Sequence, residues 1–232
     1  MKMHPQDYPF RSVAHRPGFL VGDDAAAEWC VLGFGRLYAF NQEEAAPCFR
    51  AATAEDDDLA LAWWGLAIAG GPFMNMPWNW FTLAEKAHAL PACHAAVRHA
   101  LRRCEGAAPV VQRLIGVLAV RFPSPDVPSD DQLAAREYAY ADAMVPMHDS
   151  FGNDPDVAAL LVESQIMLTP GRSMTLMRAR PIRPAGSPAS LTRCGPVPTG
   201  TSPHPAFAAG APVGRGMIRQ SRDKRGDCEK SC

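Results

Sequence analysis

The 232-residue sequence has no long uninterrupted apolar run. Its longest, residues 59–69, is far shorter than the roughly 18–20 residues that cross a bilayer. The N-terminus also lacks the continuous apolar stretch of a secretory signal. The net charge is only −1, so overall electrostatics point to no class of partner. We therefore expect a cytoplasmic protein with no membrane partner.

Aromatic and acidic residues are both scarce after residue 170. Residues 171–232 hold one of the 19 aromatic residues, Phe207, and carry 11 Lys+Arg against 3 Asp+Glu, a net of +8. Residues 1–170 carry 12 against 21, a net of −9. A Gly-, Pro- and Arg-rich segment without helical period is typical of disorder. The chain thus divides into an extended N-terminal arm (1–22), a helical domain (23–169) and a disordered tail (170–232).

Period-two alternation, the pattern of a half-buried strand, is absent from residues 23–168, which predicts an all-α domain. Helix-start signals divide this region into antiparallel helix pairs. The capping-box pairs are Asn41/Glu44, Thr82/Glu85 and Ser129/Gln132, and Asp154 precedes Pro155 at the last start. The expected helices cover about 23–40, 43–54, 56–69, 82–103, 109–122, 130–150 and 155–168.

A sequence pattern recurs after 34 residues, from Trp29 to Trp63. Within the first unit, small and aromatic residues fall 16, 20 and 23 positions after Trp29. Small side chains let two helices approach closely, and the aromatic rings fill the space around them. The residues expected to pack within the repeats are Trp29, Leu32, Gly33, Ala45, Phe49, Ala52, Trp63 and Leu66.

This spacing resembles the tetratricopeptide repeat, which has an aromatic residue, Leu and Gly on its first helix and Ala, an aromatic residue and Ala on its second. The stretch "LYAFNQEEAAPCFRAA…LAWWGLAIAGGPFMN" also resembles a bacterial family of larger tetratricopeptide-repeat proteins. The resemblance implies a TPR-like α-solenoid with a concave groove. It also implies that the chain continues beyond Pro170 with residues such as Trp-Ala-Leu-Tyr-Asp. Loss of one nucleotide from their codons gives Gly-Arg-Ser-Met-Thr, the residues at 171–175, so we expect the sequence after Pro170 to be read out of frame.

The resemblance implies a protein–protein interaction scaffold that holds a peptide or partner helix in its groove. Trp63 is expected to pack in the core, and Trp64, about 100° further around the helix, to contact the partner. The loop at residues 73–81 is expected to fold over the end of the groove. The groove positions are Ala27, Cys30, Phe34, Leu37, Tyr38, Leu61, Trp64 and Ile68, and the residues expected to bind the partner there are Phe34, Tyr38, Asn41, Leu61, Trp64, Ile68, Asn75 and Trp78.

The sequence shows no catalytic motif, metal site or cofactor site. Glu85-x-x-His88 is half of a di-iron helix-bundle motif, but no second copy exists. One alternative is a small-molecule-binding or enzymatic repeat protein with its site at Asn41, Asn75 and the tryptophan loop. Another is a nucleic-acid binder that uses the basic tail. Incomplete repeats would leave an exposed apolar end, so self-association is also expected.

Overall fold

The structure is a computed structural model, and it describes residues 4–8 and 15–168. Within these ranges it is helical and contains no strand, which confirms the all-α prediction; one isolated bridge joins Phe73 and Met76. The α-helices are α1 (Ala25–Tyr38), α2 (Gln42–Glu55), α3 (Ala60–Ala69), α4 (Leu83–Arg103), α5 (Pro109–Arg121), α6 (Asp130–Phe151) and α7 (Pro155–Met167), and two 3-10 helices are η1 (Pro5–Asp7) and η3 (Trp78–Trp80).

Side-chain caps form at the starts of α2, α4, α6 and α7. By contrast, α5 has no side-chain cap, and α3 begins at Ala60 without one rather than at residue 56 as predicted. In the capping box of α4, the Thr82 hydroxyl accepts the Glu85 N–H at 3.2 Å, and the Glu85 carboxylate accepts the Thr82 N–H at 2.7 Å. The corresponding box of α6 is also complete. At α2 only half of the predicted box forms: Asn41 accepts the Glu44 N–H, but the Glu44 carboxylate accepts a hydrogen bond from the Tyr8 hydroxyl instead. The N-terminal arm therefore takes over the acceptor that the sequence assigned to the cap.

Phe49 occupies the point where the first three helices meet. Its side chain is fully buried, and a Cβ added at Gly33 would lie 2.8 Å from its ring. A Cβ at Gly65 would lie only 2.3 Å from the same ring. Two glycines, one on α1 and one on α3, therefore let the helices close around one phenylalanine. Seven of the eight predicted packing residues are buried: Trp29, Leu32, Gly33, Ala45, Phe49, Ala52 and Leu66.

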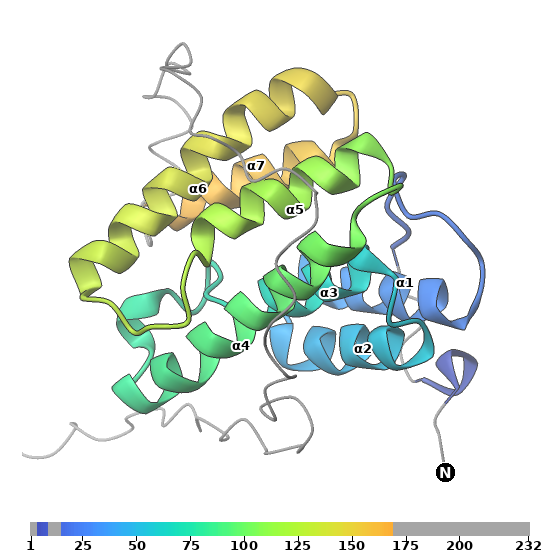
Figure 1. The fold of residues 1–232 in the computed structure, drawn as a ribbon, viewed down its shortest axis with the longest axis horizontal. Helices are drawn as coiled ribbons and strands as arrows, with labels where there is room; N and C mark the ends of the chain where they lie inside the picture. The colour runs from blue at the N-terminus through green and yellow to red at the C-terminus, as the bar shows by residue number, and fades with distance from the viewer. Residues whose placement is uncertain (1–3, 9–14, 169–232) are drawn as a thin grey trace, which may run out of the picture.

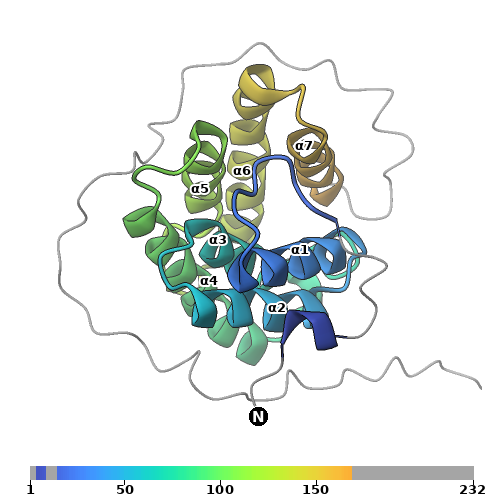
Figure 2. The same ribbon diagram turned by 90° about the vertical axis from the view of Figure 1, so that its right-hand side faces the viewer.

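The helices pack in chain order, each against the next. In addition, α3 contacts both α1 and α5, so the first helices of successive pairs also touch one another. Figures 1 and 2 show α1 to α4 in one part of the molecule, with α5, α6 and α7 lying across it. No helix in the described part of the chain is long and apolar enough to cross a membrane.

Candidate functional site

The predicted groove on α1 and α3 is covered. Ala27, Cys30, Phe34, Leu37, Leu61, Trp64 and Ile68 are all buried, and of the groove positions only Tyr38 is partly accessible. Part of the cover is the segment before α1, residues 15–22, which Figure 2 shows passing over that helix. Phe19 of this segment is itself buried, and its ring meets Phe34 edge-on with centroids 5.9 Å apart. The prediction of an open groove at these positions is therefore wrong, because their side chains are buried in the apolar core and Phe19 of the chain's own arm packs on Phe34.

The two neighbouring tryptophans have exchanged their predicted environments. Trp64 is only 1% exposed and stacks on Phe34, with centroids 5.8 Å apart and planes 19° apart. Trp63 is only partly buried on the other side of α3, where it stacks on His99 of α4 at 4.2 Å. Its indole N–H donates to the Asp57 carbonyl at 2.8 Å. The ~100° step along the helix was expected, but α3 is rotated so that Trp64 faces the core.

The tryptophan loop is divided between packing and exposure. Trp78 is buried, and its indole N–H donates to the Glu137 carboxylate at 3.1 Å. Trp80, two residues further on, is 67% exposed. Asn75 is exposed, and Asn41 caps α2. The loop thus contributes one structural hydrogen bond through Trp78 and does not bring these residues together into one site.

A buried ion pair beneath this loop escaped the sequence analysis. Arg121, at the end of α5, donates to both carboxylate oxygens of Glu137 on α6, with N–O distances of 2.8–3.1 Å. It also donates to the Pro72 carbonyl at 3.0 Å and lies over the Tyr140 ring at 4.9 Å. Burial alone would lower the pKa of Arg121, but the facing carboxylate outweighs it and the pKa is raised. Sixteen residues separate the two charges in sequence, so no helical spacing marks them as a pair.

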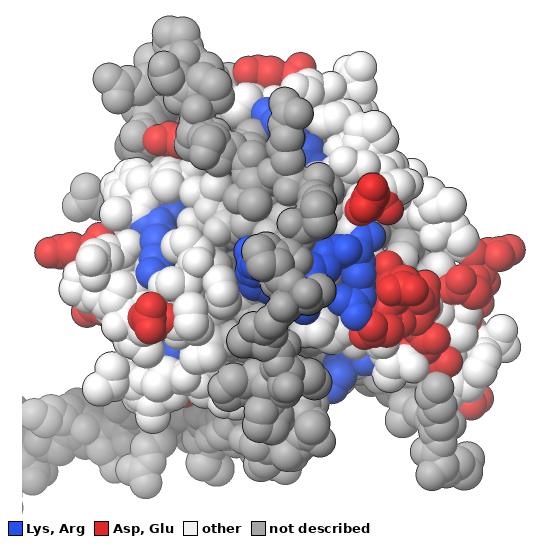
Figure 3. All heavy atoms as spheres, in the orientation of Figure 1, with Lys and Arg blue, Asp and Glu red and all other residues white. Residues whose placement is uncertain are grey.

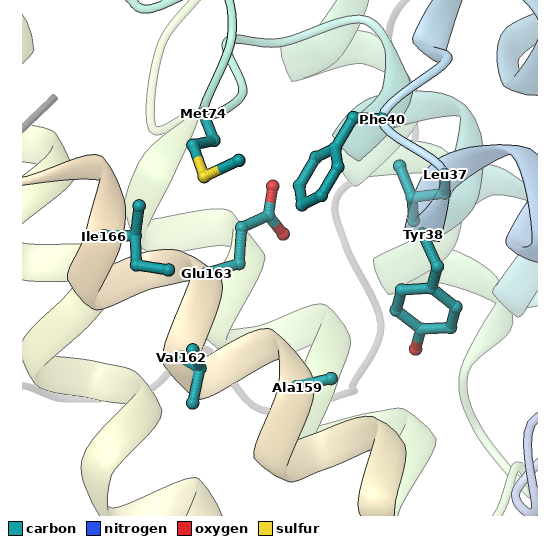
Figure 4. A pocket seen from close by; sticks show the side chains of 8 residues that line it. All are labelled: Leu37, Tyr38, Phe40, Met74, Ala159, Val162, Glu163 and Ile166. Carbon is teal, nitrogen blue, oxygen red and sulfur yellow. The ribbon is translucent and has the colours of Figure 1, made fainter. Parts of the chain in front are cut away.

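A cavity of about 300 Å³ lies between the end of α1, the loop after α3, and α7. We call it the α1–α7 cavity. Figure 4 shows its walls, which are mostly aliphatic and aromatic, with one carboxylate projecting between Met74 and Phe40. The lining residues are Leu37, Tyr38, Phe40, Met74, Ala159, Val162, Glu163 and Ile166. Only Tyr38 of the residues predicted to bind a partner lines it.

Phe40, at the rim of this cavity, has an unusual backbone. Its φ is +55°, the left-handed conformation that ends many helices and usually belongs to glycine. The Asn41 N–H donates back to the Arg36 carbonyl at 2.9 Å, as expected for such a helix end. The conformation costs about 1–2 kcal/mol in a residue with a Cβ. It leaves the ring 37% exposed beside the cavity.

Glu163 is the only acidic residue in the cavity lining. Burial raises the pKa of its carboxyl; among its neighbours Arg121 acts to lower this pKa and Glu137 to raise it. Burial likewise raises the pKa of the Tyr38 phenol. The Tyr38 hydroxyl has no hydrogen-bond partner among the described residues. The cavity therefore combines apolar and aromatic walls with one carboxylate, that of Glu163.

The cysteines and Glu85, which could also carry chemistry, have structural roles. Cys30, Cys48 and Cys93 are free and buried, and burial raises the pKa of Cys93 to about 12, which keeps it a thiol at neutral pH. The Glu85 carboxylate belongs to its helix cap. Within residues 4–8 and 15–168, no group of three or more His, Cys, Asp or Glu side chains could hold a metal ion.

The distribution of charged side chains on the described surface is relevant to the nucleic-acid alternative. In Figure 3, basic and acidic side chains lie in adjoining patches on the face shown. Among the described residues, Arg103 pairs with Asp57 and Asp58. The basic tail on which the nucleic-acid alternative rests lies outside the described residues, as do the expected disorder and frame shift after Pro170.

Comparison of the chain with protein-family models, with curated proteins and with solved structures found no match.

Proposed function

We propose that this chain is a cytoplasmic TPR-like helical-repeat protein that binds a peptide or partner helix through the α1–α7 cavity. The repeat architecture is supported by the succession of helix pairs and by the contacts of α3 with α1 and α5. The ring of Phe49 between Gly33 and Gly65 supports it as well. In such an arrangement, the first helices of the pairs line the inner face, and both α1 and α7 are first helices.

One observation carries the proposed function: the α1–α7 cavity is apolar and remains accessible. Phe40 and Val162 are 37% and 43% exposed at its rim, although large apolar side chains normally gain by leaving water. A volume of about 300 Å³ is enough for one or two apolar side chains of a partner. It also lies at the lower end of small-molecule sites. A small apolar ligand is therefore the second candidate for the same cavity.

A pair of matched substitutions tests this proposal. Ala159→Phe places a ring at an exposed position of the cavity lining, and Ala134→Phe places the same ring at an exposed position of α6 outside it. Peptides selected from a displayed random library on the wild-type chain should bind the Ala134→Phe variant normally. They should lose most of their affinity for Ala159→Phe. Peptides that bind both variants equally would place the binding surface elsewhere and refute the proposal.

A further inference from the structure

We propose that the α1–α7 cavity selects ligands that carry an ammonium group on an apolar body, with Glu163 as the counter-ion. This inference rests on the proposed function, because it specifies the chemistry of what the same cavity binds. It concerns the charge of the ligand, whereas the proposed function requires only that the cavity be occupied. The two can therefore fail separately.

The placement of Glu163 is the first reason. Its side chain projects from α7 into the space between Met74 and Phe40 (Figure 4), and no basic residue lines the cavity. No hydrogen bond or ion pair of its carboxylate occurs within the described residues. A carboxylate surrounded by apolar walls loses hydration and gains strongly from an incoming cation or hydrogen-bond donor. The ligand would supply the partner that the protein does not.

The charge balance around Glu163 is the second reason. The nearby cation is Arg121, whose Nε and Nη2 already donate to Glu137 and to the Pro72 carbonyl. The formal charges of Glu163, Arg121 and Glu137 sum to −1. The Tyr38 side of the cavity adds negative potential, because Asp154 and Asp156 act on its hydroxyl. A ring nitrogen of His15 lies 2.7 Å from the Asp156 carboxylate. An anionic ligand would meet net repulsion, and a cation would be attracted.

The remaining walls suit the same ligand. Phe40 and Tyr38 offer aromatic rings, which attract a cation at their faces. The aliphatic side chains Met74, Val162 and Ile166 would contact the apolar body. A lone carboxylate cannot by itself hold a metal ion, so an organic cation is the fitting chemistry.

Three probes with one alkyl body test the charge selectivity: hexylammonium, 1-hexanol and hexanoate. Their affinities for the full chain are measured by ligand-observed NMR titration. The wild type should bind hexylammonium at least about tenfold more tightly than hexanol, as expected for one charge-assisted hydrogen bond. Hexanoate should bind most weakly. Glu163→Gln should remove the preference for ammonium and leave hexanol binding unchanged, because Gln keeps the shape of the side chain.

Two further variants separate the outcomes. Glu105→Gln removes the same charge from an exposed site in the α4–α5 turn and should leave all three affinities unchanged. Ala159→Phe should weaken binding of every probe. If hexanol binds as tightly as hexylammonium, or Glu163→Gln keeps the preference, the charge inference is overturned. The proposed function then survives only if Ala159→Phe still blocks the probes. If no probe binds the wild type, or Ala159→Phe changes nothing, both proposals fall.

An ammonium group could come from a free amine or from a lysine side chain of a partner. A capped tripeptide with a central lysine, compared with its norleucine counterpart, separates these sources. Preference for the lysine peptide would support the inference with a partner protein as the source. Binding of hexylammonium without binding of the peptide would support it with a small amine as the source.

Discussion

The buried pair Arg121–Glu137 gives the sharpest test of how this fold is held together. Glu137→Gln keeps the size of the side chain and removes its charge. The Arg121 guanidinium, only 2% exposed, would then face a neutral amide. Arg121 also donates a hydrogen bond to the Pro72 carbonyl, and Glu137 accepts one from the Trp78 indole N–H. One substitution therefore disturbs the contacts of α5, α6 and the loop after α3 at the same time.

The expected loss follows from the geometry of this pair. Three N–O distances of 2.8–3.1 Å describe a close, bidentate contact in a site without solvent. Breaking a buried pair by removing one partner costs about 3–5 kcal/mol, because the remaining charge stays buried without its hydrogen-bonded partner. Glu163 also acts on Arg121, so we expect the lower end of this range. The double variant Arg121→Met/Glu137→Leu removes both charges. Its expected loss is only about 1–3 kcal/mol, since the Pro72 carbonyl and the Trp78 N–H lose their partners.

Urea unfolding near neutral pH measures these differences, followed by far-UV circular dichroism and by tryptophan fluorescence. Glu105→Gln, an exposed charge change, serves as the control and should stay within about 0.5 kcal/mol of the wild type. The reasoning is refuted if Glu137→Gln costs less than about 1 kcal/mol, the range of exposed pairs. It is also refuted if the double variant is less stable than the single one.

Three further predictions concern packing, strain and pH. Gly65→Ala should destabilise the fold by about 1–3 kcal/mol in urea unfolding despite the better helix propensity of alanine, because the new Cβ meets Phe49; adding Phe49→Leu should recover part of the loss. Phe40→Gly should raise stability by about 1 kcal/mol by relieving its positive φ, whereas Ala39→Gly should lower it; equal effects would argue against strain at residue 40. Burial and the neighbouring arginines lower the pKa of His99 to about 4. The unfolded chain therefore binds more protons between about pH 6.5 and pH 4 and stability falls on acidification through this range, a fall that should be smaller in His99→Gln.

The helices were predictable because their signals are local. Thr82 and Glu85 cap α4 from within one turn, and so do Ser129 and Gln132 for α6. The contact of Phe49 with Gly33 follows from the spacing of one helix pair. Each of these features depends on residues that the helical period brings together. The sequence therefore contains the information needed to predict them.

The candidate site was not predictable in the same way. The α1–α7 cavity joins Tyr38, Phe40 and Met74 to Glu163, and no local period relates residues so far apart. Phe40 lines this cavity from a backbone position with positive φ, and no turn-forming residue marked that position. Of the groove positions proposed from sequence, only Leu37 and Tyr38 line the cavity, because the positions were assigned from one surface of two helices without knowledge of what covers it.

The sequence by itself determined which segments are helical, where most of them begin, and that small residues lie at the closest helix contacts. Only the tertiary structure decided which face of each helix remains accessible. It placed Trp64 in the core and Trp63 against His99, and it brought Phe19 over Phe34. The physical reason is that the helical period fixes the angles between side chains on one helix. The rotation of that helix is set by the apolar area that its neighbours, including the N-terminal arm, can bury together.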